Sequence, residues 1–547
     1  MLGLMQDVPL LVSSLIRHAD RHHGDVEIVS RRVEGDIHRT TYRQLHARAR
    51  RLANALDALG AGLSDRIATL AWNGYRHMEL YYGISGKGAV VHTINPRLPA
   101  EQIAWITRHA EDTALFFDLT FLPIVEKIAA QCTTVRAFVA LTDRAHMPAA
   151  SAIPGLLCYE ELLAAQSDRY AWPALDENLA SSMCYTSGTT GHPKGVLYSH
   201  RSTLLHTFAV ALPDALNFSA KDVLLPVVPM FHVNAWGIPY AATMVGAKLV
   251  FPGPALDGKS VYELMEAEKV TVSAGVPTVW QALLTHLERN TLRFSTMRRT
   301  IIGGAALPPA MLRSFEETHN VAALHAWGMT EMSPVGTACA LRAKHATFDR
   351  EALYAVKSKQ GRAVFGVDMR IVDPEGRDLP WDGVASGELL VRGPWVAGSY
   401  FRGDGGNPLV ADADGMSWFP TGDVATIDAD GYMKITDRSK DVIKSGGEWI
   451  SSIDIENVAM SHPAVAMSAC IGIAHPKWDE RPLLVVVCKP GAQVTREELL
   501  RHYEGKVAKW QVPDDVAFVD AIPVGATGKM LKNKLRELFS EYRLPTA

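Results

Sequence analysis

The stretch from residue 185 to 195 constrains this chain more than any other: Tyr-Thr-Ser-Gly-Thr-Thr-Gly-His-Pro-Lys-Gly. It directly follows a short apolar run, which predicts a buried strand that ends in a glycine-rich loop. Backbone N–H groups in such a loop can form a concave nest for an anion, and threonine, serine and lysine side chains add further donors. A flexible surface turn would not explain a strand, a glycine loop and a lysine in this order. We therefore expect the loop to bind phosphate, through Thr186, Ser187, Gly188, Thr189, Thr190, Gly191 and Lys194.

This loop is not the common nucleotide-triphosphate loop, which requires the pattern G-x-x-x-x-G-K-[ST]. Counted from Gly188, the position of the second glycine holds Pro193, and Lys194 is followed by Gly195. A kinase or a motor ATPase built on that loop is therefore disfavoured.

Length and composition indicate a multidomain enzyme. A chain of 547 residues is too long for one hydrophobic core. The net charge of −4 implies no general attraction to nucleic acid or to an anionic membrane. The six cysteines are scattered, mostly among apolar neighbours, and include no C-x-x-C pair. This pattern favours free thiols in a reducing compartment, so we expect a cytoplasmic protein.

Residues 223 to 247 contain no Asp, Glu, Lys or Arg and are numerous enough to span a bilayer. Three prolines within them would break a helix, and His232 and Asn234 are polar. We therefore predict a buried, irregular segment that lines a cavity, and no membrane span. Charged residues from Asp7 onward also argue against a secretory signal.

Strand-like and helix-like segments alternate over the first three-quarters of the chain. Short apolar runs separated by helical patterns predict an α/β fold with largely parallel sheets covered by helices on both faces. Thr41 and Gln44 form a capping box for one of these helices. The predicted strands cover residues 67–72, 114–117, 137–141, 248–251, 271–276 and 300–302.

The pattern changes after about residue 365. Segments 367–372 and 387–392, with a hairpin near 428–431, predict antiparallel strands and a small β-barrel-like part. The last hundred or so residues predict a small α+β module that ends in a basic helix. We expect an N-terminal domain of residues 1–436 and a C-terminal domain of residues 437–547, joined by a hinge.

Other segments have compositions suited to nucleotide chemistry. Small residues at 303–306 follow a predicted strand and would let a flat ring approach the backbone. The Trp-Gly-Met-Thr-Glu segment at 327–331 combines a ring, a hydroxyl and a carboxylate that could ligate Mg²⁺. Asp423 follows a glycine, and Lys529 lies on a glycine loop near the end of the chain. Each of these segments alone is weak evidence for a nucleotide site, because ordinary turns and solvated charged residues often have the same composition.

The order of these segments resembles that of the acyl- and aryl-CoA synthetases of the adenylate-forming superfamily, which also includes firefly luciferase and peptide-synthetase adenylation domains. The resemblance extends from about Thr40 to Arg536. The segments at 231–236 and 446–451 look most like those of bacterial fatty-acyl-CoA ligases and 3-methylmercaptopropionyl-CoA ligases.

The resemblance implies an ATP-dependent acyl-CoA ligase. A carboxylate attacks the α-phosphorus of ATP to give acyl-AMP and pyrophosphate, and the CoA thiolate then displaces AMP. ATP, Mg²⁺, coenzyme A and a small carboxylic acid are the implied ligands. The uncharged segment at 223–247 favours an aliphatic or thioether acid.

The resemblance also implies roles for single residues. Lys529, Glu331 and His232 would be catalytic, and Thr186 with Glu331 would hold Mg²⁺. The adenine would lie against Gly304, Ala305, His325, Ala326 and Trp327. Thr330 would bind phosphate, and Asp423 with Arg438 would bind the ribose. The acyl pocket would be lined by His232, Val233, Trp236, Gly303 and Gly328.

The hinge is expected at Asp437. Rotation there would bring a second set of residues to coenzyme A, namely Ser445, Gly446, Gly447, Glu448 and Trp449. Lys440 and Lys444, just past the hinge, are expected to touch phosphate or ribose in one of the two states.

Two positions depart from the family pattern. Trp327 stands where relatives often have tyrosine, so a phenolic hydrogen bond would be lost while stacking on adenine is kept. Ser452 stands where many relatives have proline, which leaves every role intact.

Several alternatives remain. The acyl group could be transferred to a carrier protein, although no carrier module follows Lys529, or the acid could be aromatic. Light production shares the first half-reaction. A non-catalytic scaffold is disfavoured because Glu331, Asp423 and Lys529 are all present. A homodimer through the N-terminal domain is a further expectation.

Overall fold

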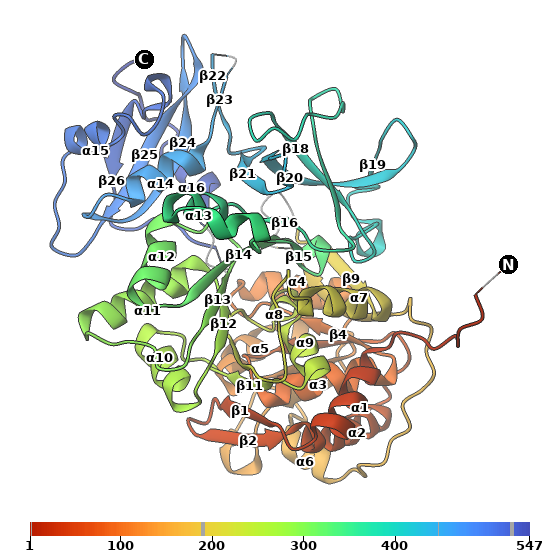
Figure 1. Cartoon of the computed structure of the whole chain (residues 1–547). Helices are drawn as coiled ribbons and strands as arrows, with labels where there is room; N and C mark the ends of the chain where they lie inside the picture. Colours follow the sequence, from red (N-terminus) through yellow and green to blue (C-terminus); the bar gives the residue numbers. More distant parts are fainter. Residues whose placement is uncertain (2, 187–191, 447, 526–529) are drawn as a thin grey trace.

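A computed structural model describes residues 1, 3–186, 192–446, 448–525 and 530–547. Figure 1 shows a large body that contains two helix-covered sheets, with a small antiparallel sheet and an α+β unit above it. The predicted α/β fold with a separate C-terminal α+β domain is confirmed.

A seven-stranded sheet forms one half of the body. All neighbouring strands are parallel except the last pair, which form the hairpin that carries the glycine loop. Their order is β7 (Leu157–Cys158), β6 (Ala137–Ala140), β5 (Ala114–Phe117), β3 (Arg66–Leu70), β4 (Val90–Thr93), β8 (Ala180–Tyr185) and β9 (Gly195–Ser199). The associated helices are α2 (Tyr42–Ala58), α3 (Tyr75–Lys87), α4 (Ala100–Ala110), α5 (Leu122–Ile128) and α6 (Tyr159–Ala164).

A nine-stranded sheet forms the other half, with a parallel centre and antiparallel edges. Its order is β16 (Arg362–Ala363), β15 (Val335–Ala338), β14 (Ala322–Gly328), β13 (Arg299–Ile302), β12 (Val272–Gly275), β10 (Val223–Pro226), β11 (Lys248–Phe251), β1 (Glu27–Arg31) and β2 (Ile37–Thr41). Its helices include α1 (Val12–His23), α7 (His200–Ala211), α8 (Val233–Trp236), α9 (Ile238–Val245), α10 (Gly258–Ala267), α11 (Pro277–Arg289), α12 (Pro309–Arg313) and α13 (Arg350–Lys357).

The antiparallel part follows in sequence, as the change in pattern predicted. It is a five-stranded sheet with the strand order β17-β18-β20-β19, and β21 pairs with β20 outside this order. The strands are β17 (Asp368–Val372), β18 (Ser386–Arg392), β19 (Val410–Ala411), β20 (Ser417–Ile427) and β21 (Met433–Arg438).

The C-terminal unit is a five-stranded sheet with helices on both faces. Alternate residues of its central strand β25 (Asp479–Cys488) enter two separate cores. Leu484 and Val486 pack with α14 (Ser452–Met460) and α15 (Arg496–His502), whereas Leu483 packs with α16 (Lys532–Leu538). This alternation follows from the two-residue period of a strand. The other strands are β22 (Ile443–Ser445), β23 (Glu448–Ile450), β24 (Val465–His475) and β26 (Asp515–Phe518).

Local predictions hold with small shifts at element ends. Thr41 caps α2 with Gln44, and Thr495 caps α15 with Glu498, in two capping boxes. The uncharged segment at 223–247 is buried as predicted, but it is less irregular than expected. It contains β10, the short α8 and the helix α9. Pro239 does not break α9, because it lies in the first turn of that helix, where proline costs no hydrogen bond.

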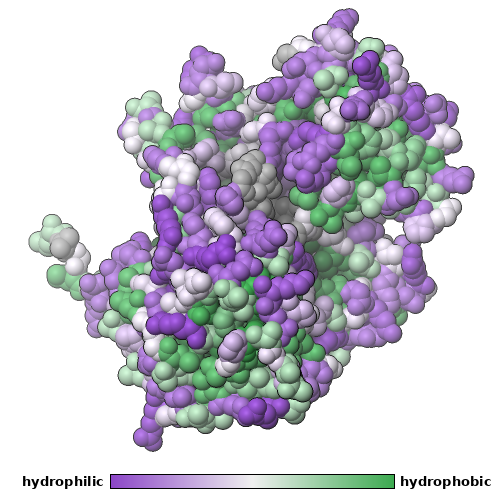
Figure 2. Space-filling model, turned by 180° about the vertical axis from the view of Figure 1, so that it is seen from behind, coloured by the Kyte–Doolittle hydropathy of each residue, from purple (hydrophilic) through white to green (hydrophobic). Residues whose placement is uncertain are grey.

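None of the helices in the described part of the chain combines the length and apolar character needed to cross a bilayer. The face opposite that of Figure 1 intersperses hydrophobic with hydrophilic residues (Figure 2). All six cysteines are free, and five of them are buried.

Candidate functional site

The base of the glycine loop is closed by a pair of hydrogen bonds. The Thr186 N–H donates to the Lys194 carbonyl over 2.9 Å, and the Lys194 N–H donates to the Thr186 hydroxyl over 3.1 Å. These bonds continue the β8–β9 ladder into the loop, where Tyr185 pairs with Gly195. Ser187, Gly188, Thr189, Thr190 and Gly191 lie outside the described residues.

One tyrosine connects this loop to Glu331. The Tyr400 hydroxyl donates to Glu331 Oε1 over 2.8 Å. The Lys194 ammonium lies 4.7 Å from the centroid of the Tyr400 ring. Two predicted site residues, Lys194 and Glu331, therefore meet on one side chain that no sequence motif indicated.

Thr330 and Glu331 lie on a short 3₁₀ turn, η5 (Thr330–Met332), directly after β14. Both are buried, at 8% exposed each. The Tyr198 hydroxyl donates to the Thr330 carbonyl over 2.6 Å, and the Ala397 N–H donates to the Glu331 carbonyl over 2.7 Å. The backbone of the turn is thus held from two sides, which fixes where the carboxylate points.

The residues predicted to hold Mg²⁺ suit that ion. Glu331 supplies a carboxylate and Thr186 a half-buried hydroxyl, and Mg²⁺ prefers such oxygen ligands. Both lie at the carboxyl ends of parallel strands, β14 and β8, where α/β sheets usually bind ligands.

Trp327, Asp423 and Arg438 come together although they belong to different sheets. The Trp327 indole Nε1 donates to Asp423 Oδ2 over 2.9 Å. Arg438 Nε lies 3.7 Å from Asp423 Oδ1, because the two residues are paired in the β20–β21 register. The predicted adenine wall and the predicted ribose carboxylate are therefore in direct contact.

The ends of β13 and β14 approach Trp236 closely. A side chain at Gly303 would come within 3.1 Å of the Trp236 ring and within 2.7 Å of the Ala326 carbonyl. Gly304 has a φ of +78° and also faces this ring, whereas Ala305 is exposed. Small residues are needed here to leave room for the Trp236 ring. The predicted contact of these residues with adenine stays a prediction.

His325 and Gly328 lie beside these residues. Burial lowers the pKa of His325 to about 4, so its ring is neutral near pH 7, and its Nδ1–H donates to the Ser358 carbonyl over 3.1 Å. A Cβ at Gly328 would collide with the Pro334 carbonyl, so backbone packing alone requires glycine there.

The predicted acyl wall contains a left-handed turn. Four consecutive residues, from Val233 to Trp236, have φ between 46° and 58°, and Gly237 follows at 76°. Val233 and Trp236 are buried, and His232 is half-buried at the start of the turn. Asn234 anchors the turn, since its Nδ2 donates to the Ser182 hydroxyl over 3.0 Å and its Oδ1 accepts from Tyr81 at 3.3 Å.

The predicted coenzyme A residues lie elsewhere. They belong to the β22–β23 hairpin, which Figure 1 shows at the outer edge of the C-terminal unit, far from β14. Lys444 is exposed there, the Ser445 hydroxyl accepts from Arg481, and Gly446 N–H donates to the Trp478 carbonyl. Gly447 and Lys529 lie outside the described residues. Glu448 and Trp449 lie on β23 of the hairpin, and Lys440 precedes the hairpin in sequence.

The predicted hinge residue is bound to the C-terminal unit. Asp437 is 1% exposed, and its Oδ2 accepts from the Ser452 N–H at 2.6 Å. Burial raises the pKa of Asp437, and the cation of Lys532 partly opposes this rise.

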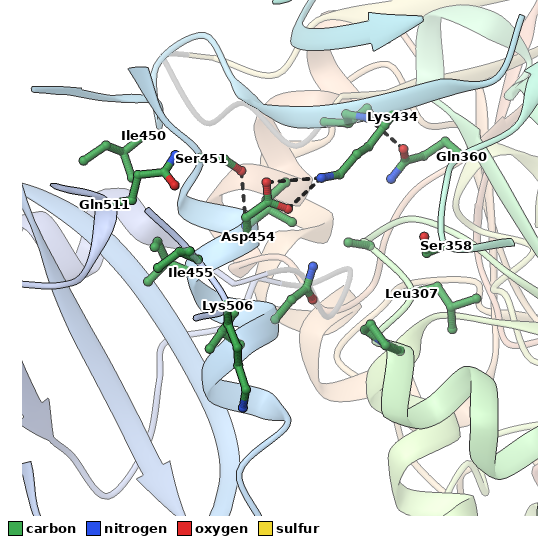
Figure 3. A pocket seen from close by; sticks show the side chains of 17 residues that line it. Leu307, Ser358, Gln360, Lys434, Ile450, Ser451, Asp454, Ile455, Lys506 and Gln511 are labelled. Carbon is green, nitrogen blue, oxygen red and sulfur yellow. Dashed lines mark hydrogen bonds and ion pairs between the residues drawn. The ribbon is translucent and has the colours of Figure 1, made fainter. Parts of the chain in front are cut away.

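A cavity of about 400 Å³ lies between the body and the C-terminal unit (Figure 3). Leu307 and Ser358 line it from one side, and Ile455 and Lys506 line it from the other. Its lining includes Ala306, the residue next to Ala305. The ion pair of Lys434 and Asp454, at 2.9 Å, bridges the cavity. The cavity is thus next to the predicted adenine segment, and Glu331 and Lys194 are not among the residues that line it.

Sequence reasoning missed Tyr198, Tyr400 and the anchoring role of Asn234. Tyr198 follows the glycine loop on β9, so its place on that strand could have been inferred, but its contact with Thr330 could not. Tyr400 lies in an irregular segment that carries no sequence signal.

Comparisons with known proteins identify the family of this chain. The model of the AMP-binding enzyme family matches residues 15–401, and that of the AMP-binding enzyme C-terminal domain matches residues 454–529. A 3-methylmercaptopropionyl-CoA ligase of Ruegeria lacuscaerulensis is 54% identical, with 99% of each chain covered. A medium-chain-fatty-acid–CoA ligase of Ectopseudomonas oleovorans is 50% identical over all of this chain and 98% of its own.

A solved structure supports the fold. The crystal structure of an anthranilate CoA ligase in complex with anthranoyl-AMP aligns with a TM-score of 0.84 at 24% identity, covering 98% of this chain and 99% of that one.

The chain belongs to the AMP-binding enzyme family. The prediction of an AMP-forming acid–thiol ligase, an ATP-dependent acyl-CoA ligase, is confirmed. Its reaction uses ATP, Mg²⁺, coenzyme A and a carboxylic acid.

Proposed function

We propose that the acid is aliphatic, either a medium- or long-chain fatty acid or a thioether acid such as 3-methylmercaptopropionate. The observation that carries this proposal is the segment 223–247, which has no charged side chain and is largely buried, and which we expect to wall the acyl site. An apolar wall favours an alkyl or thioether chain and disfavours a second carboxylate or an ammonium group. The names of the two relatives, which share half of their residues with this chain, support the same range of acids.

The site residues are proposed to act as the resemblance implies. Trp327 and Gly304, with Ala305, His325 and Ala326, hold the adenine, and Asp423 with Arg438 holds the ribose. The glycine loop, Lys194 and Thr330 hold phosphate oxygens. Thr186 and Glu331 hold Mg²⁺, which when bound neutralises phosphate charge. His232, Val233, Trp236, Gly303 and Gly328 surround the acyl chain.

The chemistry requires two anions to meet. A carboxylate oxygen forms a bond to the α-phosphorus, and the bond from that phosphorus to the bridging oxygen of pyrophosphate breaks. Fixed donors and cations reduce the repulsion and align the attack. Lys529 is proposed to approach the carboxylate and the α-phosphate, while the loop residues retain the departing pyrophosphate.

A change of domain position is proposed between the two half-reactions. Residues 1–436 and 437–547 would be the two rigid parts, with the hinge at Asp437. The cavity between them and the distance of the β22–β23 hairpin from β14 support this proposal. Rotation would bring Ser445, Gly446, Gly447, Glu448 and Trp449 toward the thiol of coenzyme A, with Lys440 and Lys444 near the nucleotide.

The test is pyrophosphate release over a panel of acids. The panel contains short- to long-chain fatty acids, 3-methylmercaptopropionate, aryl acids and a dicarboxylate. We expect the highest kcat/KM for a medium-chain or thioether acid, and a dicarboxylate lower by at least about tenfold because its second charge would be desolvated. A preference for aryl acids or dicarboxylates would overturn the proposed substrate. If no acid of the panel gives pyrophosphate release although ATP binds, a non-catalytic binding protein would be favoured.

The acceptor is tested by a separate measurement of thioester formation. Free coenzyme A and a phosphopantetheinylated carrier protein are offered after acyl-AMP has formed. We expect thioester with coenzyme A, and thioester only on the carrier protein would support carrier loading.

A cytoplasmic homodimer through the N-terminal domain is also proposed. The free cysteines support a reducing compartment.

The N-terminal arm supports a dimer, since it leaves the body (Figure 1) and exposes the large apolar side chains of Met1, Leu4, Met5 and Val8. Fractionation of cells tests the compartment, and cofractionation with membranes or periplasm would exclude it.

A further inference from the structure

Tyr400 occupies a position that none of the proposed roles uses. It lies in the irregular segment after β18, immediately before the turn η7 (Phe401–Gly403). Its hydroxyl and its ring make different contacts. The hydroxyl donates to Glu331 Oε1 over 2.8 Å, and the ring receives the Lys194 ammonium at 4.7 Å from its centroid.

We propose that Tyr400 is a positioning residue that couples the metal-binding carboxylate to the lysine of the glycine loop. The hydroxyl holds one oxygen of Glu331, and the ring holds Lys194. The inference rests on the proposed roles of Glu331 and Lys194, and it adds a residue that acts on both through separate groups.

The segment that carries Tyr400 is attached to the turn of Glu331. The Ala397 N–H donates to the Glu331 carbonyl over 2.7 Å, and the Ser333 hydroxyl donates to the Trp395 carbonyl over 3.1 Å. The Trp395 indole donates to the Val335 carbonyl over 3.2 Å. Three contacts within six residues of Tyr400 thus fix its distance from Glu331.

The same segment is attached to the body on its other side. Asp404 lies 3.4 Å from His109 Nε2, and Arg402 pairs with Glu111 at 2.5 Å. Gly405 has a φ of +78°, and a side chain there would collide with the Lys194 ammonium. The segment therefore leaves room for the lysine at the place where the Tyr400 ring receives it.

The chemistry of the phenol suits a permanent donor. A phenol keeps its proton near neutral pH, so the Tyr400 hydroxyl is available as a donor to Glu331. A hydrogen bond to a carboxylate is stronger than one between neutral groups and orients the acceptor. A lysine over an aromatic face is held by the ring and not by the hydroxyl. The two contacts can therefore be removed separately.

The experiment uses Tyr400→Phe and Tyr400→Leu in the full-length enzyme. Phe keeps the ring and removes the hydroxyl, and Leu removes both. Initial rates of pyrophosphate release are measured against Mg²⁺ at fixed ATP and against ATP at saturating Mg²⁺. We expect Tyr400→Phe to raise the Mg²⁺ concentration for half-maximal rate about tenfold, with the KM for ATP changed less than about twofold. We expect Tyr400→Leu to raise both.

Tyr432→Phe is the matched control. Tyr432 is buried, whereas Tyr400 is half-buried. The Tyr432 hydroxyl donates to the Ala340 carbonyl over 2.7 Å, and Arg362 lies 5.5 Å from the centroid of the Tyr432 ring. Tyr432 therefore has the same two kinds of contact but touches neither Glu331 nor Lys194. We expect its Mg²⁺ dependence to equal that of the wild type, even if its thermal midpoint falls.

Two results would overturn the inference. One is an unchanged Mg²⁺ dependence in Tyr400→Phe, and the other is an equal shift in Tyr432→Phe. Failure of the proposed function would look different, because the wild type itself would then release no pyrophosphate. If Tyr400→Leu does not fold, the comparison of Tyr400→Phe with Tyr432→Phe still decides.

Discussion

Single side chains determine how the site is connected. Trp327 illustrates this at the scale of one residue. The sequence predicted that replacing tyrosine by tryptophan would keep stacking and lose a hydrogen bond. The structure shows that the indole supplies a hydrogen bond of its own, to Asp423 at 2.9 Å. The wall expected to contact the base thus also orients the carboxylate expected to bind the sugar.

Backbone conformation at residue scale determines where Trp236 lies. A left-handed conformation costs about 1–2 kcal/mol for each L-residue other than glycine. The turn from Val233 to Trp236 contains four such residues. Asn234 tolerates this conformation best, and its buried amide ties the turn to Ser182 and Tyr81.

We predict that Asn234→Ala lowers the free energy of unfolding by about 2 kcal/mol, because the buried Ser182 hydroxyl loses its amide donor, while Tyr81 keeps the Met230 carbonyl as an acceptor. Release of the turn should also move Trp236 from Gly303 and change the chain-length preference. Denaturant unfolding and the KM values of a fatty-acid series measure the two effects.

Asn217→Ala is the control for this prediction. Asn217 also has a positive φ, of 57°, but is exposed. The Asn217→Ala substitution should lower the free energy of unfolding by less than about 1 kcal/mol, which is close to the cost of the left-handed backbone conformation alone. It should leave the acid preference of the enzyme unchanged. Equal effects of the two substitutions would show that the anchoring hydrogen bonds of Asn234 contribute nothing.

At the scale of elements, the last helix is attached to the segment that joins the two domains. Lys532 and Arg536 lie one turn apart on α16 and therefore share one helix face. Lys532 Nζ lies 2.7 Å from Glu456 Oε1 and 2.5 Å from the Ser452 hydroxyl. Arg536 pairs with Asp441 at 2.6 Å. In sequence, α16 begins three residues after Lys529, and Asp441 lies four residues after Asp437, the proposed hinge.

The Lys532 contacts predict the effects of its removal. Burial opposes the charge on Lys532, but Glu456 and Asp437 hold its pKa above the ordinary value. Lys532→Met would leave Glu456 buried without its cation, so we expect a loss of about 3–5 kcal/mol in the free energy of unfolding. Acyl-AMP formation should fall further than thioester formation from supplied acyl-AMP, as it should in Lys529→Ala. Urea unfolding and separate assays of the two half-reactions test this.

Lys534→Met provides the comparison on the same helix, because Lys534 pairs only with the exposed Glu537 in the described part of the chain. It should change neither stability nor either half-reaction appreciably. If Lys532→Met lowers the rates of both half-reactions equally, Lys532 stabilises the fold but does not position the Lys529 loop.

At the scale of the whole molecule, the N-terminal arm predicts association. Met1 and the residues 3–8 extend from the body, and Leu4 and Met5 are 88% and 87% exposed. Burying such side chains against a second copy would contribute favourable free energy at each contact. We expect light scattering on the intact chain to give twice the monomer mass of 59.7 kDa. Deletion of residues 1–8 should shift the equilibrium toward monomer, and a monomeric intact chain at micromolar concentration would contradict the proposed dimer.

Much of the architecture follows from local patterns. The capping boxes at Thr41 and Thr495 are formed as their spacing predicts. The segments at 185–195 and 303–306 follow predicted strands, which belong to the seven-stranded and the nine-stranded sheet. Parallel strands bring their carboxyl ends to one edge of each sheet. The segment at 223–247 was harder to predict, because composition shows that it is buried but not that it turns left-handed.

The sequence by itself determined the reaction class, because the residue types and the order of the motifs are properties of the chain alone. Only the tertiary structure decided how these residues are held, because their partners are remote in sequence. Tyr400 and Glu331 are 69 positions apart, and Trp327 and Asp423 are 96 apart. Such contacts depend on how two sheets and their connecting segments pack, which no local pattern specifies.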